Sequence, residues 1–128
     1  ELFENVRQGS LECVALCEQA QHYRDLAMQC TQAITGMPGS GDKTGKQERF
    51  VTALVDVQKE LQERLHTLIE NKAKAEELID TLQDPQERAV MRMYYLSGLS
   101  MEEIAEHAGK ERTWPYRLKK EALKKLGN

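Results

Sequence analysis

The chain has 128 residues and a formal net charge of −3, with 40% hydrophobic, 30% charged and only 5% aromatic residues. This length allows one domain, or a small domain with a helical arm. Glu, Lys, Leu, Ala and Gln are abundant and alternating runs of Val, Ile and Tyr are missing, which predicts an all-α protein. Without a membrane-spanning apolar run or a signal peptide, we expect a cytoplasmic protein with no membrane partner.

The first predicted helix runs from about Leu2 to Ile34. It carries three cysteines, Cys13, Cys17 and Cys30, whose odd number favours a reducing compartment over a disulfide framework. No second Cys/His pair accompanies them, so we expect no metal site. Small and apolar residues recur at alternating spacings of four and three, a heptad pattern typical of helix packing. They are Leu2, Val6, Gly9, Cys13, Leu16, Ala20, Tyr23, Ala27, Cys30 and Ile34.

A glycine-rich segment, residues 36–45, is predicted to end this helix and form a loop. A second helix follows from about Lys46 to Leu82, and Lys72 interrupts its apolar stripe after a shift of register between Leu61 and Leu68. We interpret that shift as a bend or a change of packing partner. The stripe comprises Phe50, Leu54, Val57, Leu61, Leu65, Leu68, Ala75, Ile79 and Leu82. Residues 1–83 are therefore predicted to form a long antiparallel helical hairpin.

Residues 84–128 carry the signals of three short helices. Asp84 is a predicted cap for a helix that starts with Pro85 and runs to about Leu96. Ser100 and Glu103 predict a capping box for the next helix, and Gly109 predicts a left-handed turn before a helix that ends near Leu126. One small core is expected, formed by Val90, Met93, Tyr94, Leu99, Ile104, Ala105 and Ala108 with Leu118, Ala122, Leu123 and Leu126.

Charge is distributed unevenly along the chain. Residues 1–83 carry −5, residues 84–109 carry −3 and residues 110–128 carry +5. A basic end of this kind suggests a polyanionic partner there. No catalytic constellation, P-loop or metal motif stands out, because the GMPGSGDKTGK segment lacks the G-K-S/T ending of a phosphate-binding loop. We therefore expect neither an enzyme nor a cofactor.

The segment LSMEEIAEHAGKERTWPYRLKKEALKKL resembles region 4 of bacterial sigma factors, with its L-S-x-E-E-I-A pattern and glycine turn. Together with the GMPGSG-DK loop, it makes the chain similar to a phage and prophage family of small sigma-like proteins, which includes the RinA and ArpU type regulators of late transcription. The resemblance implies a helical N-terminal half followed by a sigma region 4-like helix-turn-helix domain over residues 84–128.

In sigma region 4 the start of the last helix reaches base edges in the major groove. By this resemblance Arg112, Thr113 and Arg117 are expected at base edges and Tyr116 at the phosphate backbone. Arginine can pair with guanine O6 and N7, and threonine can hydrogen-bond to a base or touch a thymine methyl. The candidate phosphate contacts, each equally well explained as a solvated surface charge, are Lys110, Lys119, Lys120 and Lys124.

Trp114 and Pro115 depart from the family's pattern of a polar residue followed by an aliphatic core residue. Because proline is tolerated only in the first turn, the last helix is predicted to begin late, with Thr113 as its cap and Trp114 first. Trp114 would fill the core gap, stack on DNA sugar or meet a protein partner, and we favour packing or a partner.

These features predict a phage-type transcription regulator in a bacterial host cell. It would bind double-stranded promoter DNA, with RNA polymerase as the protein partner implied by the resemblance, and its N-terminal helices would support a homodimer or dock on another protein. The alternative is a protein-interaction module that docks on polymerase or another regulator without reading DNA.

Overall fold

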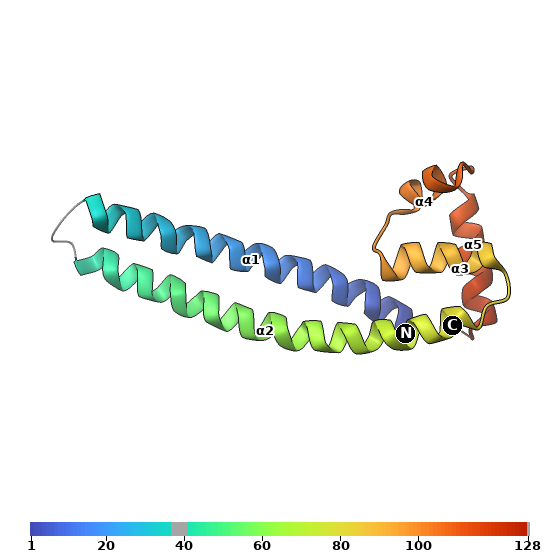
Figure 1. Ribbon diagram of the computed structural model, residues 1–128, viewed down its shortest axis with the longest axis horizontal. Coiled ribbons are helices and arrows are strands. Elements are labelled where there is room, and N and C mark those ends of the chain that lie inside the picture. Colours follow the sequence, from blue (N-terminus) through green and yellow to red (C-terminus); the bar gives the residue numbers. More distant parts are fainter. Residues whose placement is uncertain (37–40, 128) are drawn as a thin grey trace. The chain divides into compact units, whose positions relative to one another are not determined.

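A computed structural model of the chain describes residues 1–36 and 41–127, with side chains described for residues 1–30 and 45–127. Its elements are α1 (Leu2–Gly36), α2 (Gly41–Asp80), α3 (Pro85–Met91), the π-helical η1 (Arg92–Leu96), α4 (Met101–Ala108) and α5 (Trp114–Lys125) (Figure 1). No strand is present in the described residues, which confirms the predicted all-α class. In the same residues, no helix combines the length and the apolar character needed to cross a bilayer.

Two compact units divide the chain. One contains Glu1–Ser10 together with Thr67–Asn128, and the other contains Leu11–His66. This division differs from the expected boundary at residue 83, because the C-terminal helices share their unit with the start of α1 and the end of α2. Phe3 makes one of the contacts that join the start of α1 to the C-terminal helices. Its ring centroid lies 5.1 Å from that of Tyr95.

The Leu11–His66 unit pairs α1 with α2. Arg64 of α2 forms an ion pair with Glu12 of α1 and another, at 3.4 Å, with Glu60 one turn earlier. Both pairs are half-exposed, and exposed pairs contribute less than about 1 kcal/mol each. The buried seam of this unit is made mostly of small side chains at heptad spacing, namely Cys13, Ala20, Ala27 and Val57.

The start of α2 lies inside the segment that was expected to form a loop. The helix begins at Gly41, so the predicted loop of residues 36–45 extended too far, and residues 37–40 lie outside the described part. A glycine in a helix interior costs only about 1 kcal/mol, which neighbouring helical residues can offset. The glycine content of this segment therefore led to a predicted loop that was too long.

The apolar stripe of α2 continues without the expected shift of register. Leu61, Leu68 and Ala75 follow one another at seven-residue spacing and are half-buried or buried. Leu65 was included in the predicted stripe, but its side chain is 37% exposed, since it lies on the flank of this face. Within the other unit, a Cβ added to Gly9 would lie 3.3 Å from Leu68 Cδ1, so glycine suits a close approach there.

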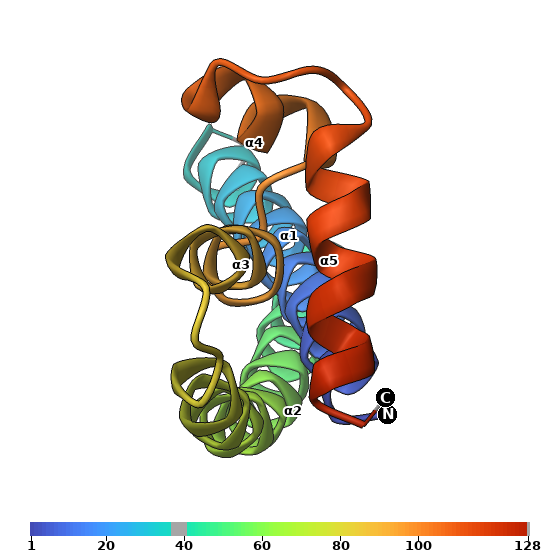
Figure 2. The same cartoon turned by 90° about the vertical axis from the view of Figure 1, so that its right-hand side faces the viewer.

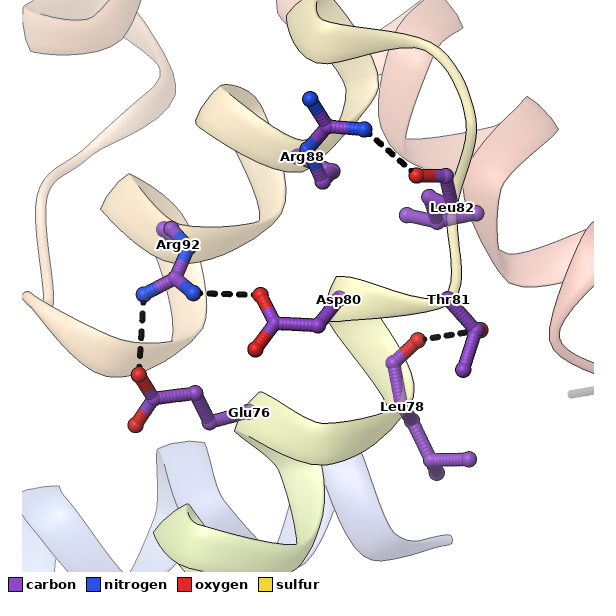
Figure 3. Close-up of polar contacts among 7 residues, drawn as sticks. All are labelled: Glu76, Leu78, Asp80, Thr81, Leu82, Arg88 and Arg92. Atoms are coloured by element: carbon purple, nitrogen blue, oxygen red, sulfur yellow. Dashed lines mark hydrogen bonds and ion pairs between the residues drawn. The ribbon is translucent and has the colours of Figure 1, made fainter.

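The first short helix of the other unit, α3, begins with the predicted cap. This unit comprises Glu1–Ser10 and Thr67–Asn128. The Asp84 side chain accepts a hydrogen bond from the Gln86 backbone N–H at 2.9 Å, and Pro85 opens α3. The Arg88 guanidinium donates to the Leu82 carbonyl at 2.6 Å (Figure 3). It also donates to the Gln83 carbonyl at 3.1 Å, so both acceptors in the connection from α2 are satisfied. Backbone groups outside the helices are thus paired by a side chain from the following helix.

One residue of η1 is tied to α2 by two ion pairs. The Arg92 guanidinium contacts Glu76 at 3.1 Å and Asp80 at 2.5 Å (Figure 3). The hydrogen bonds with these carboxylates, that with Asp80 foremost, raise the pKa of Arg92 above its usual value. Because all three side chains are about half-exposed, the contribution to stability is modest.

The π-helical turn of η1 replaces the ordinary helix expected up to Leu96. The Ser97 N–H donates to the Arg92 carbonyl at 3.0 Å, a bond that spans five residues. Carbonyls at this helix end accept from two cations of the long helices: Arg7 donates to Tyr94 and Lys72 donates to Leu96, each at 3.1 Å. Cations at a helix C-terminus are favoured by its dipole. Lys72 therefore links α2 to the C-terminal end of η1.

Tyr95 is buried, with 4% of its surface exposed, and burial raises the pKa of its phenol to about 12. In the unfolded chain the Tyr95 phenol titrates near pH 10, so the folded state should lose stability as the pH rises from about 10 towards 12. Below about pH 10 this group should leave the stability unchanged. The expected loss is about 1.4 kcal/mol per pH unit in that window. Urea denaturation of the wild type and Tyr95→Phe at pH 8 to 12 measures it, since the variant lacks this titration; parallel pH profiles would contradict the prediction.

Candidate nucleic-acid interface

The capping box predicted for α4 is present. The Glu103 N–H donates to Ser100 Oγ at 3.1 Å, and the Ser100 N–H donates to Glu103 Oε1 at 3.2 Å. Gly109 ends the helix at φ 65°, in the left-handed region, and the Lys110 N–H closes the turn on the Ala105 carbonyl at 2.9 Å. These local signals direct the chain from α4 into α5, as in a helix-turn-helix.

The core of this arrangement joins α3, α4 and α5. Val90, Met101, Ile104 and Leu118 form its buried cluster, and partly buried Met93, Tyr94, Leu99 and Trp114 pack against it. Figure 2 shows α5 beside α3, with α4 near the N-terminal end of α5. Expected members of the core such as Ile104, Ala105 and Ala122 are buried, whereas buried Met91 and Met101 were not anticipated.

The last helix begins where Pro115 predicts. Thr113 occupies the N-cap position and Trp114 is the first helical residue, although the Thr113 hydroxyl makes no capping hydrogen bond. Pro115 is fully buried, and Trp114 is half-buried against the core cluster. Pro115 is thus buried at the start of α5, and the indole of Trp114 packs against the core cluster.

Five of the six residues predicted to contact DNA are exposed. Thr113, Tyr116, Arg117 and Lys120 lie on α5 or at its N-cap, and Arg112 lies in the turn just before it. Helical spacing from Thr113 through Arg117 and Lys120 to Lys124 places these positions opposite buried Leu118 and Ala122. We call Arg112, Thr113, Tyr116, Arg117, Lys120 and Lys124 the outward face of α5.

Lys119 lies apart from the outward face. It is half-buried, and its Nζ lies 4.8 Å from the centroid of the Tyr94 ring. The Arg7 guanidinium carbon lies 3.9 Å from the same centroid. Cations over an aromatic face are attracted by its quadrupole, so Lys119 has an intramolecular partner that the sequence did not indicate.

The structural role of Glu87 was not predicted from the sequence. Its side chain is buried and accepts from Lys125 Nζ at 2.9 and 3.0 Å. The hydrogen bond to this carboxylate raises the pKa of Lys125. A signal was available, because Glu87 is separated from Val90 and Tyr94 by three and then four residues and so shares their side of the helix.

Other candidate chemistry is sparse in the described part of the chain. The three cysteines all lie on α1, with Cys13 buried and Cys17 exposed. Within the described residues, no three His, Cys, Asp or Glu side chains gather in a group that fits a metal ion. The exposed carboxylates of Glu102 and Glu106 make the surface of α4 acidic, in contrast to the outward face of α5.

The fold and this site define an all-α protein with a helix-turn-helix whose last helix is basic on its outward side. The chain belongs to the family described as "Protein of unknown function (DUF1492)", whose model matches residues 30–127. No curated protein and no solved structure matches the chain. The family match includes all of α5 and leaves out the start of α1, where Phe3 and Arg7 lie.

Proposed function

We propose that the protein regulates transcription by binding double-stranded promoter DNA through the outward face of α5. The observation that carries this proposal is the exposed side of α5 formed by Thr113, Tyr116, Arg117 and Lys120, with Arg112 exposed in the turn just before this helix. A helix of this kind fits the major groove of B-form DNA. The resemblance to sigma-like phage and prophage proteins adds RNA polymerase as the proposed protein partner.

The residues of the outward face would make two kinds of contact, to base edges and to phosphates. Arg112 and Arg117 carry the planar donors that pair with guanine, and Thr113 can hydrogen-bond to a base or touch a thymine methyl. Tyr116, 53% exposed, and Lys120 would hold the phosphate backbone, which positions the helix without reading sequence. One short helix reads few base pairs, so a second copy or polymerase would be needed for useful affinity.

The test compares neighbouring lysines. Lys120→Gln is expected to reduce the slope of log K against log salt by about 1, because each lost phosphate contact releases about one counterion fewer. Lys119→Gln is expected to change the slope less, since Lys119 Nζ lies over the Tyr94 ring. Fluorescence anisotropy of labelled duplex DNA from 50 to 200 mM salt measures both slopes.

Two outcomes would count against the proposal. If the wild type binds no duplex at low salt, the isolated protein does not bind DNA by this face. If Lys119→Gln and Lys120→Gln change the slope equally, the outward face does not govern the electrostatic contact. Circular dichroism of each variant should match the wild type, which separates lost contacts from lost folding.

A second function is favoured by the acidic surface of α4. Exposed Glu102 and Glu106 would suit a basic surface on polymerase or another regulator, with exposed Tyr116 as an aromatic anchor. In that case the protein is an interaction module and DNA contact is secondary. Weak, salt-insensitive binding to DNA combined with binding to purified polymerase would favour this alternative.

A further inference from the structure

A second apolar stripe runs along α2, on the flank of the face that packs on α1. Val51, Val55, Leu65 and Ile69 are 44%, 41%, 37% and 65% exposed. With exposed Gln58 and Gln62 between them, they follow spacings of four, three, four, three and four residues. This heptad spacing keeps all six on one side of a helix and is typical of a helix that packs against another helix. We call these six residues the outer stripe of α2.

The outer stripe is complementary to itself. If two copies of α2 run antiparallel with Glu60 at the centre, Val51 lies opposite Ile69 and Val55 opposite Leu65. In the same register, Gln58 lies opposite Gln62. Each smaller valine thus faces a larger aliphatic side chain, and the amides face one another at the middle. A two-fold interface requires a surface that matches itself in this way.

Charge also favours a second copy as the occupant. Two identical surfaces repel each other when they carry charge, but none of the six residues of the outer stripe is charged, although α2 is rich in charged residues elsewhere. The amides of Gln58 and Gln62 can donate and accept across a two-fold axis. A polar layer within an apolar stripe also helps to specify the register of helix pairs.

We propose that a second copy of this chain covers the outer stripe, with the two α2 helices antiparallel and the two-fold axis near Glu60. This inference is independent of the DNA-binding proposal. It specifies the surface and the register of a homodimer, and each copy would contribute the same six residues.

The register is tested by exchanging charges across the axis. Leu65→Glu and Val55→Lys are each expected to raise the dissociation constant of the dimer by roughly 100-fold, because a charge would be buried against an apolar side chain. The double variant is expected to recover most of the lost affinity, since Glu at 65 would face Lys at 55 of the other copy. Analytical ultracentrifugation over a range of concentrations measures all four proteins.

Asp56→Lys is the matched control, because Asp56 is exposed on α2 outside the outer stripe. It should dimerise as the wild type does, and circular dichroism should show unchanged helix content in every variant. A wild type that stays monomeric at high concentration would overturn the proposal, as would a Leu65→Glu variant that dimerises normally. A double variant that stays monomeric would overturn the antiparallel register, because parallel helices would place like charges together.

Discussion

Replacing Ile104 by alanine is expected to lower the free energy of unfolding of the helix-turn-helix by about 2–5 kcal/mol. Ile104 is fully buried in the cluster with Val90, Met101 and Leu118, so its loss leaves a cavity that three helices must close around. The total stability of a small domain is only about 5–15 kcal/mol. We therefore expect Ile104→Ala to be partly unfolded at physiological temperature.

The single tryptophan supplies the measurement. Trp114 packs against the same cluster, so its fluorescence during urea denaturation reports on this core and not on the Leu11–His66 unit. Ile104→Val removes one methylene-sized group and should lower the free energy of unfolding by about 0.5–1.5 kcal/mol. Equal effects of the valine and alanine variants would show that Ile104 is not packed as described.

Arg117→Ala is expected to weaken binding to a preferred DNA site by about 1–3 kcal/mol, or roughly 5- to 150-fold. Arg117 is exposed on the outward face of α5, one turn after Thr113. If the guanidinium pairs with a guanine, its removal should affect the preferred site far more than random DNA. The preferred site can be obtained by selecting bound duplexes from a random pool, with and without polymerase.

The control for this experiment is Arg24→Ala, which removes an exposed arginine from α1 and should leave DNA binding unchanged. Competition of the selected duplex against random duplex gives the specificity ratio for each protein. An equal loss on both duplexes would reassign Arg117 to the phosphate backbone. No loss on either would remove it from the interface.

Features set by short stretches of chain could be predicted from the sequence. Asp84 caps α3, Ser100 and Glu103 form their capping box, and Gly109 adopts the left-handed turn. The late start of α5 followed from Pro115 alone, because proline cannot lie deeper in a helix without losing a hydrogen bond. The exposure of the outward face followed from helical periodicity in the same way.

Features set by distant residues could not be predicted. Arg7 donates a hydrogen bond to the Tyr94 carbonyl, 87 positions away in the sequence, and no local pattern predicts that contact. The π-helical turn depends on such partners, since Arg7 and Lys72 satisfy carbonyls at its end. Lys119 illustrates the same limit at the candidate site, because its position over Tyr94 depends on how α5 packs against η1.

The contacts of residues 1–10 with η1 have a consequence for synthesis on the ribosome. Phe3 and Arg7 are made at the start of α1, whereas their partners Tyr95 and Tyr94 are made after both long helices. At about 5–20 residues per second, the start of α1 waits several seconds for them. During that interval Phe3 and Val6 stay uncovered by the partners they acquire in the folded unit. The unit can therefore close only after η1 has been made, which makes this slow closure the expected last step of its folding.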